Sequence, residues 1–349
     1  MRTLNYKLLV ILFVAFAGIA NAQDKYEKKF HEQYDVNKET TFEISNKFGD
    51  IIITNTKVNT ITIDAEIVVK SRSKAKADKI MDKISVNISK EGNTINAETM
   101  IDNISSNNSD FEINYTVAMP AYVNIKLINK YGNVTINELH GKSVLAVKYG
   151  SLNVNKILDG NKKPLSSVEL GYCENSRINE FYWGKIIIKY SKLKVGTGKA
   201  LAISSKYSKL RLGTFSSVVA ESGYDDYDIK SIANMVLTAK YSNIDIEKLT
   251  KKLKVENKYG DIRVNEMPDG FESVDVVSKY AKISLGLSLN ANYKLDARAR
   301  YADIKYNNMK IRRIIKEDHG MEISGYSGNE STKTTVKVVS EYGNVDLRD

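Results

Sequence analysis

The 349-residue chain carries 52 Lys and Arg against 42 Asp and Glu, a formal net charge of +10. This length allows one large domain or two ordinary ones. The single cysteine, Cys173, excludes an intramolecular disulfide, and the three histidines lie far apart without the spacing of metal ligands. We therefore expect neither a metal site nor a cofactor.

Residues 1–22 have the pattern of a secretory signal peptide. Arg2 and Lys7 form the positive start, residues 8–17 are apolar, and Ala20-Asn21-Ala22 is a small-residue cleavage site. The apolar run is shorter than the roughly 20 residues that a spanning helix needs, which argues against a membrane anchor. We expect an exported protein, periplasmic or at the cell surface, that is not membrane-spanning after cleavage. Its mature net charge of +8 favours an anionic partner, weakly.

Residues 23–120 are predicted to form a small α+β cap. Ala77, Ile80, Met81 and Ile84 fall at the i, i+3, i+4 and i+7 spacing of a short amphipathic helix within 71–84. The remaining pattern is that of β-strands. They are expected over residues 42–53, 60–69, 84–88, 95–97 and 111–117, with a hairpin turn at 90–93. The predicted role of this module is to close the end of the array that follows.

Residues 121–349 are dominated by a repeated phrase, first written Lys-Tyr-Gly-Asn-Val-Thr-Ile at 130–136. Its tyrosines recur at short, nearly constant intervals from Tyr131 to Tyr301, and looser copies begin at Lys47 and Glu341. A unit this short cannot hold a propeller blade or a helix pair, but it can hold one turn of a β-solenoid. We therefore predict an all-β fold, a single-chain parallel β-helix (β-solenoid) of about 17–21-residue repeats with the small N-terminal cap.

The side chains within each repeat alternate as in a half-buried strand. Apolar residues stand three and five positions after the tyrosine, as Leu193 and Val195 do after Tyr190. Residues two and four positions before the tyrosine are expected to point to the same side of the strand as the tyrosine. We interpret the tyrosines as a stacked core column whose hydroxyls reach solvent at a corner; the alternative is an aromatic strip that grips sugars.

The residues between and beside these strands predict corners and insertions. Gly, Ser or Ala after most of the tyrosines is expected to let the backbone turn tightly and to leave room for the neighbouring repeat. Residues 159–167 lengthen one turn, and residues 307–335 are expected to hold a hidden repeat around Tyr326. Residues 181–183, Phe-Tyr-Trp, form either a ligand-stacking loop or an aromatic plug. Cys173, which follows Tyr172 at a corner, is predicted to be a small buried residue.

Four features in this order resemble the putative-adhesin domains of unknown function found in bacterial envelope proteins. They are the strand Lys47-Phe48-Gly49-Asp50-Ile51, the Ala/Lys-rich helix, the strand end at 117–120, and the phrase at 129–139. The resemblance covers nearly all of the mature chain, although Ser or Ala often replaces the corner Gly here. It implies a secreted β-solenoid of the envelope and no catalytic residue.

A carbohydrate-active β-helix enzyme, a polysaccharide lyase or hydrolase, is the competing prediction. Its only candidate acids are Glu221, Asp225, Asp226 and Asp228, which could bind a cation or act as an acid/base pair. Asp226 and Asp228 stand one repeat after Lys209 and Arg211, so salt bridges between neighbouring repeats are the simpler interpretation. A third alternative is an envelope-stress accessory protein. Nucleic acid is not an expected partner of an exported chain.

Cations superimpose in pairs if neighbouring repeats of equal length stack on each other. The pairs would be Lys189 with Lys206, Lys192 with Lys209 and Lys194 with Arg211, extended by Lys148 and Lys240 in the same column. We predict that these residues lie on one outer face and bind an acidic glycan or another anionic envelope component. The alternative is that mobile lysines only keep this edge soluble. The predicted function is thus a secreted, non-enzymatic adhesin or binding or structural protein.

Overall fold

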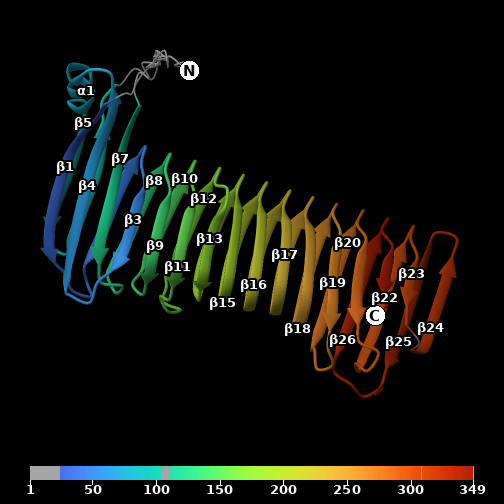
Figure 1. Ribbon diagram of the computed structural model, residues 1–349. Helices are drawn as coiled ribbons and strands as arrows, with labels where there is room; N and C mark the ends of the chain where they lie inside the picture. The colour runs from blue at the N-terminus through green and yellow to red at the C-terminus, as the bar shows by residue number, and fades with distance from the viewer. Residues whose placement is uncertain (1–23, 104–109, 308, 349) are drawn as a thin grey trace, which may run out of the picture.

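The computed structural model describes residues 24–103, 110–307 and 309–348, and in them the chain is built almost entirely of β-strands. Figure 1 shows these strands side by side along one axis. One helix, α1 (Lys74–Met81), lies at the N-terminal end of the described part, and no helix found there could cross a membrane. The all-β prediction is confirmed. The predicted signal peptide, residues 1–22, lies outside the described residues.

An antiparallel sheet and a hairpin form the N-terminal end. Strand β4 pairs with β1 along one edge and with β7 along the other, and β5 pairs with β6. Helix α1 buries Ala77 and Met81, as its apolar stripe predicts, and it ends before the predicted residue 84 because Ile84 begins β5. The strands are β1 (Asp24–Asp35), β2 (Thr41–Lys47), β3 (Ile51–Asn55), β4 (Thr60–Ser71), β5 (Ile84–Glu91), β6 (Thr94–Ile101) and β7 (Asp110–Met119).

Two parallel ladders begin at this end. In the first ladder β2, β8, β10, β12 and β14 pair in that order. In the second, β3, β9, β11 and β13 do so. The looser copy at Lys47 therefore joins the same ladders as the later copies, and residues 159–167 include the predicted loop, between β11 and β12. The strands are β8 (Asn124–Lys130), β9 (Val134–Leu139), β10 (Ser143–Lys148), β11 (Leu152–Ile157), β12 (Ser166–Gly171), β13 (Ser176–Phe181) and β14 (Trp183–Lys189).

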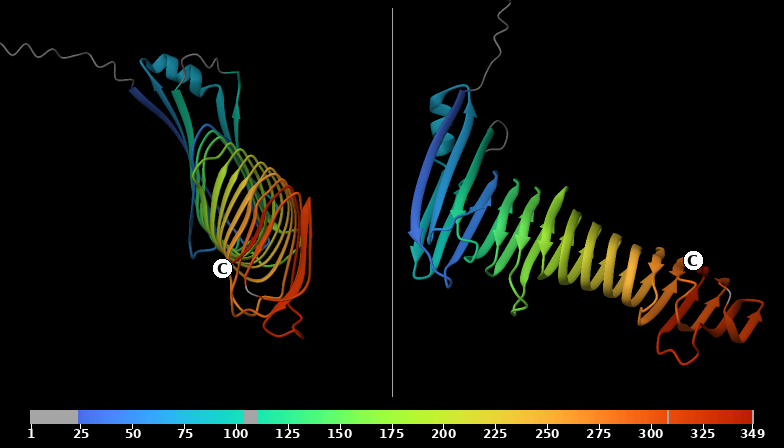
Figure 2. Two further views of the ribbon diagram at one scale, coloured as in Figure 1. Left: turned by 90° about the vertical axis from the view of Figure 1, so that its right-hand side faces the viewer. Right: turned by 60° about the horizontal axis from the view of Figure 1, so that its bottom comes forward.

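Four long strands in the middle of the chain belong to both ladders. The first part of β15 pairs with β13, and its last part pairs with β14. Strands β15, β16 and β17 pair in register one repeat apart, so Lys192 lies beside Lys209 and Lys209 beside Asp226. Figure 2 shows these repeats end-on as overlaid loops. The strands are β15 (Lys192–Lys206), β16 (Lys209–Gly223), β17 (Asp226–Lys240) and β18 (Asn243–Lys258).

The core consists of the apolar side chains that point inward from both ladders. Leu193 and Val195 from one ladder and Leu201 and Ile203 from the other are at most 4% exposed. Leu210, the equivalent of Leu193 in the next repeat, is fully buried. The predicted alternation of apolar residues is confirmed at these positions. Burial of apolar surface between neighbouring repeats is the main source of stability in such an array.

The order of strands at the C-terminal end differs from the order in the chain. β26 lies between β20 and β22, and β27 lies between β21 and β23. The prediction of a hidden repeat around Tyr326 is wrong, because this residue lies in β25, which pairs antiparallel with β22 and with β24. The strands are β19 (Ile262–Met267), β20 (Ser273–Lys279), β21 (Ile283–Leu287), β22 (Tyr293–Arg300), β23 (Ile304–Tyr306), β24 (Lys310–Glu317), β25 (Gly320–Ser327), β26 (Thr335–Glu341) and β27 (Val345–Leu347).

Candidate functional site

The repeat tyrosines form one continuous aromatic ladder. Neighbouring ring centroids lie 4.6 to 5.1 Å apart, with ring planes within 16° of parallel. This spacing matches the distance between paired strands, because each ring lies one repeat from the next. In spatial order the aromatic ladder is Phe48, Tyr131, Tyr149, Tyr172, Tyr190, Tyr207, Tyr224, Tyr241, Tyr259, Tyr280, Tyr342 and Tyr301.

The aromatic ladder lies on the surface rather than in the core. Its members are 37% to 51% exposed, with Phe48 the least and Tyr172 the most exposed. The prediction that the rings stack is confirmed, and the prediction that they form a core column is wrong. Among the described residues, none of the ladder hydroxyls has a hydrogen-bond partner in the protein, whereas buried tyrosines such as Tyr227 do.

The backbone conformation of the tyrosines explains their exposure. Every member of the aromatic ladder has a positive φ, between +51° at Tyr190 and +61° at Tyr224 and Tyr259. This left-handed conformation is uncommon for residues with a bulky side chain, and it costs on the order of 1–3 kcal/mol. It turns the ring away from the core although the residue shares the parity of buried neighbours. Alternation along the strand alone therefore placed the tyrosine rings on the core side, which is wrong.

The small residue after most of the tyrosines leaves room for the neighbouring repeat, as predicted, but it does not make the turn. It is the tyrosine that adopts the left-handed turn, whereas at the N-terminal corners the following glycine allows close approach of the backbones. A Cβ on Gly132 would lie 1.9 Å from the carbonyl oxygen of Gly49, and one on Gly150 would lie 2.0 Å from that of Gly132. In the middle of the chain Ser191 and Ser208 take this position, and the Ser191 amide donates to Ser208 Oγ at 3.3 Å.

A row of cations runs along one side of the aromatic ladder. The residue before each ring is Lys or Arg in nine of the twelve repeats, and these residues lie side by side in the first parallel ladder. Lys206 Nζ lies 5.3 Å from the Tyr207 ring centroid and Arg300 Cζ 5.2 Å from that of Tyr301, so cations and rings share one surface. The cation row consists of Lys47, Lys130, Lys148, Lys189, Lys206, Lys240, Lys258, Lys279 and Arg300.

Four of the predicted site residues belong to the cation row. Lys189 pairs with Lys206 in register, as predicted. Lys148 and Lys240 lie in the same column, separated from this pair by Gly171 and Gly223. The sequence signal for the rest of the row was the lysine that opens each copy of the phrase.

The other four predicted residues form a separate basic patch on the second parallel ladder. Lys192 lies beside Lys209, and Lys194 lies beside Arg211 and also beside Arg177 of β13. These side chains line a shallow depression of about 480 Å³, together with Asn175. Lys192 pairs with Glu174 at 2.7 Å and Arg211 with Asp228 at 3.6 Å. Lys194, Lys209 and Arg177 make no ion pair within the described ranges.

The predicted pairs of cations are thus in register, but they do not share one face. Lys189 and Lys206 end strands of the first parallel ladder, whereas Lys192 and Lys209 begin strands of the second. Tyr190 and Tyr207 lie at the corners between them. The left-handed turn at each tyrosine separates the two groups because it carries the chain from one ladder to the other.

The candidate acids also divide into two groups. Asp226 lies beside Lys209 and Asp228 beside Arg211, as the repeat spacing predicts, and both carboxylates are exposed. Asp225 is buried at a corner, where its carboxylate accepts hydrogen bonds from Ser205 Oγ, Ser222 Oγ and the backbone amides of Ser208 and Gly223. These donors satisfy the Asp225 carboxylate, and the searched part of the chain has no acid or histidine cluster that fits a metal ion.

Phe181 and Cys173, which belong to two further candidates, lie in the core. Phe181 is fully buried and therefore cannot stack on a ligand, whereas Tyr182 and Trp183 are half-buried. Cys173 is fully buried, as predicted, and this burial raises the pKa of its thiol. A raised pKa lowers the thiolate fraction and hence the reactivity of the side chain.

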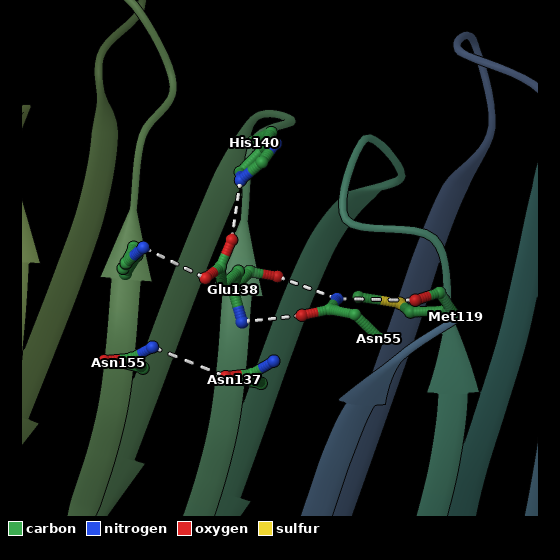
Figure 3. A network of polar contacts seen from close by, with 7 residues as sticks. Asn55, Met119, Asn137, Glu138, His140 and Asn155 are labelled. Atoms are coloured by element: carbon green, nitrogen blue, oxygen red, sulfur yellow. Dashed lines mark hydrogen bonds and ion pairs between the residues drawn. The ribbon is translucent and has the colours of Figure 1, made fainter. Parts of the chain in front are cut away.

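Side-chain amides connect the first repeats, as Figure 3 shows. Asn55 Oδ1 accepts from the Glu138 amide at 2.8 Å, and Asn55 Nδ2 donates to the Glu138 carbonyl at 3.0 Å. Asn155 Nδ2 donates to Asn137 Oδ1 at 3.4 Å. Lys156, with His140, holds the pKa of the Glu138 carboxyl below its usual value. The Asn55 contacts tie the repeat at Lys47 to the one at Lys130, and the Asn155 and Lys156 contacts tie the repeat at Lys130 to the one at Lys148.

No family model and no curated protein matches this chain. It is similar to solved structures described as a putative cell adhesion protein from Clostridium sporogenes and putative adhesins from Parabacteroides merdae and Parabacteroides distasonis. Sequence identity is 10% in each case, and the TM-scores are 0.20, 0.40 and 0.38. The matches cover 92%, 73% and 73% of this chain and 99%, 95% and 96% of the others. These descriptions name the group of proteins that the sequence resembles.

Proposed function

We propose that the protein is an exported, non-enzymatic β-solenoid of the bacterial envelope that binds an anionic envelope or surface component in an adhesin-like role. The observation that carries the proposal is the basic patch, in which Lys192 lies beside Lys209 and Lys194 beside Arg211. Such pairs repel by about 1 kcal/mol in water at a separation near 5 Å, before screening by salt. An anionic ligand would offset this repulsion.

The solenoid interpretation rests on the pairing of strands. In the middle region each long strand takes part in both parallel ladders, so one repeat would be one turn of a flattened coil. Equivalent outward side chains of successive turns then lie at nearly constant intervals along the coil axis. A rigid scaffold of this kind loses little conformational freedom on binding, which favours affinity.

The experiment measures retention on an anionic polysaccharide matrix. The variant Lys192→Glu/Lys209→Glu should bind much more weakly than the parent, with a difference that shrinks as salt is raised. The matched control is Lys74→Glu/Lys76→Glu, which makes the same change of net charge on exposed residues of α1. Equal losses in the two variants would mean that net charge alone matters and would contradict the proposed site.

A second measurement separates binding from catalysis. The purified protein is incubated with anionic and neutral polysaccharides, and the products are analysed by size. Retention of an anionic chain without new fragments supports a binding protein. Fragments with new reducing or unsaturated ends would instead show a hydrolase or lyase.

A further inference from the structure

The aromatic ladder and the cation row together form one continuous edge, which we call the Tyr–Lys edge. We propose that this edge is a binding track for a linear anionic polysaccharide that lies along the long axis of the molecule. The inference rests on the proposed function and deepens it, since it names the ligand class and a surface larger than the basic patch. The track spans eleven intervals of about 4.8 Å, or roughly 50 Å.

The charges along this edge favour a polyanion. Seven of the nine cations in the row make no ion pair in the part of the chain that the structure describes; only Lys148 and Lys279 do, with Glu169 and Glu341. The opposite flank of the aromatic ladder is mixed, with Lys192 and Lys209 but also Glu174 and Asp226. A solubilising surface needs no such one-sided order, because scattered charges of both signs serve that purpose. A ligand with regularly spaced anionic groups matches the row.

The rings favour a ligand that carries hydroxyl groups. Each inner ring has both faces stacked against its neighbours, and Phe111 and His319 pack against the two ends, at Phe48 and Tyr301. Sugars therefore cannot stack on the ring faces. What the ladder offers is its ring edges and a row of hydroxyls, none of which has a protein partner within the described residues. Such hydroxyls can donate to and accept from the hydroxyls of a sugar chain.

Backbone strain supports a role beyond folding. Twelve non-glycine residues hold a left-handed φ at the same corner of successive repeats. Asn or Gly would adopt this conformation at lower cost. Ring stacking offsets part of it, by about 0.5–1.5 kcal/mol for each aromatic pair. Strained conformations of this kind concentrate at binding and catalytic sites, where the surrounding structure maintains them.

The arrangement predicts that affinity depends on the length of the ligand. A single exposed ion pair contributes only about 0–1 kcal/mol, so a short oligosaccharide binds weakly. Once one part of a longer chain is bound, each further contact forms within the same complex, so the overall affinity rises with the number of contacts. A polysaccharide with many anionic groups can therefore contact several lysines of the row at once.

The test uses size-defined oligogalacturonates, shorter and longer than the track, with polyphosphate as an anionic chain without sugars. Dissociation constants are measured by calorimetry for the full mature chain. Lys47→Glu/Lys258→Glu changes the cation row on either side of the basic patch, and Lys74→Glu/Lys76→Glu is the charge-matched control. We expect the edge variant to lose about tenfold or more in affinity for long oligomers and little for short ones.

The hydroxyls are tested separately with Tyr190→Phe/Tyr207→Phe/Tyr241→Phe, which preserves the ring stack. We expect several-fold weaker binding of long oligogalacturonate with no change for polyphosphate. Two results would overturn the track and leave the proposed function intact. One is equal affinity for short and long oligomers. The other is an unchanged affinity for long oligomers in the Lys47→Glu/Lys258→Glu and triple Tyr→Phe variants, while Lys192→Glu/Lys209→Glu still abolishes binding. No binding of any anionic chain by the parent protein would overturn both.

Discussion

The middle and the two ends of the molecule follow different rules. From β15 to β18 each strand stacks on the one before it in chain order, one repeat further along the chain. At the N-terminal end β2 lies between β6 and β8, although β3, β4 and β5 separate it from β6 in the chain. At the C-terminal end β26 lies between β20 and β22. Chain order thus equals spatial order only in the middle.

This difference shows what a repeat can and cannot encode. In the middle, identical spacing places every apolar residue over its equivalent, so one register satisfies all hydrogen bonds and all core contacts. At an end, a strand edge has no neighbouring repeat and would be free to pair with another chain. Antiparallel pairings occur at both ends: β7 pairs parallel with β3 but antiparallel with β4, and β25 pairs antiparallel with β22.

The largest expected effect is the loss of the C-terminal end when the chain is stopped after Thr334. Without β26 and β27, the segment from β22 to β25 has no strand partner in the rest of the described molecule. Hydrogen exchange should show protection lost over residues 293–327 and retained over β15 to β18. Retained protection over 293–327 would mean that β22 pairs directly with β20, as chain order alone suggests.

A smaller but still large effect is expected for Leu210→Asp. This side chain is fully buried in the middle region, and an unpaired carboxylate there should lower the free energy of unfolding by about 3–5 kcal/mol. The matched control is Val219→Asp on the same strand, which is 53% exposed and should change it by less than about 1 kcal/mol. Chemical denaturation compares the two, and equal midpoints would contradict the assignment of the inner face.

Opposite substitutions at the corners should lower stability in both regions, for different reasons. Gly132→Ser introduces a Cβ that would lie 1.9 Å from the Gly49 carbonyl oxygen, so a loss of about 1–3 kcal/mol is expected. Ser208→Gly, in the middle, removes the acceptor of the Ser191 amide and should cost about 1 kcal/mol. Thermal denaturation measures both. A neutral Gly132→Ser would mean that the N-terminal corners tolerate the side chains used in the middle.

The smallest effect is a coupling between Lys279 and Glu341, which pair at 3.0 Å across β20 and β26. Both side chains are partly exposed, so the pair should contribute only about 0.2–1 kcal/mol. Lys279→Glu and Glu341→Lys should each lower stability slightly, and the double variant should recover it. Additive losses in this double-mutant cycle would place β26 away from β20.

The candidate site was only partly predictable from the sequence. The repeat spacing correctly aligned Lys192 with Lys209 and Lys194 with Arg211. It could not show that Lys189 and Lys206 belong to a different side of the aromatic ladder. Parity within a strand is a local rule, and it no longer applies once Tyr190 or Tyr207 takes a left-handed φ.

The sequence by itself determined the strands of the repeats, their period and the apolar residues that point inward, because alternation and repeat spacing are properties of the chain alone. The tertiary structure decided where the last repeat goes. Tyr342 stacks between Tyr280 and Tyr301, although it follows both in the chain, because β26 fits between β20 and β22. It also decided that the tyrosines face solvent, since only the conformation of each corner directs the ring outward.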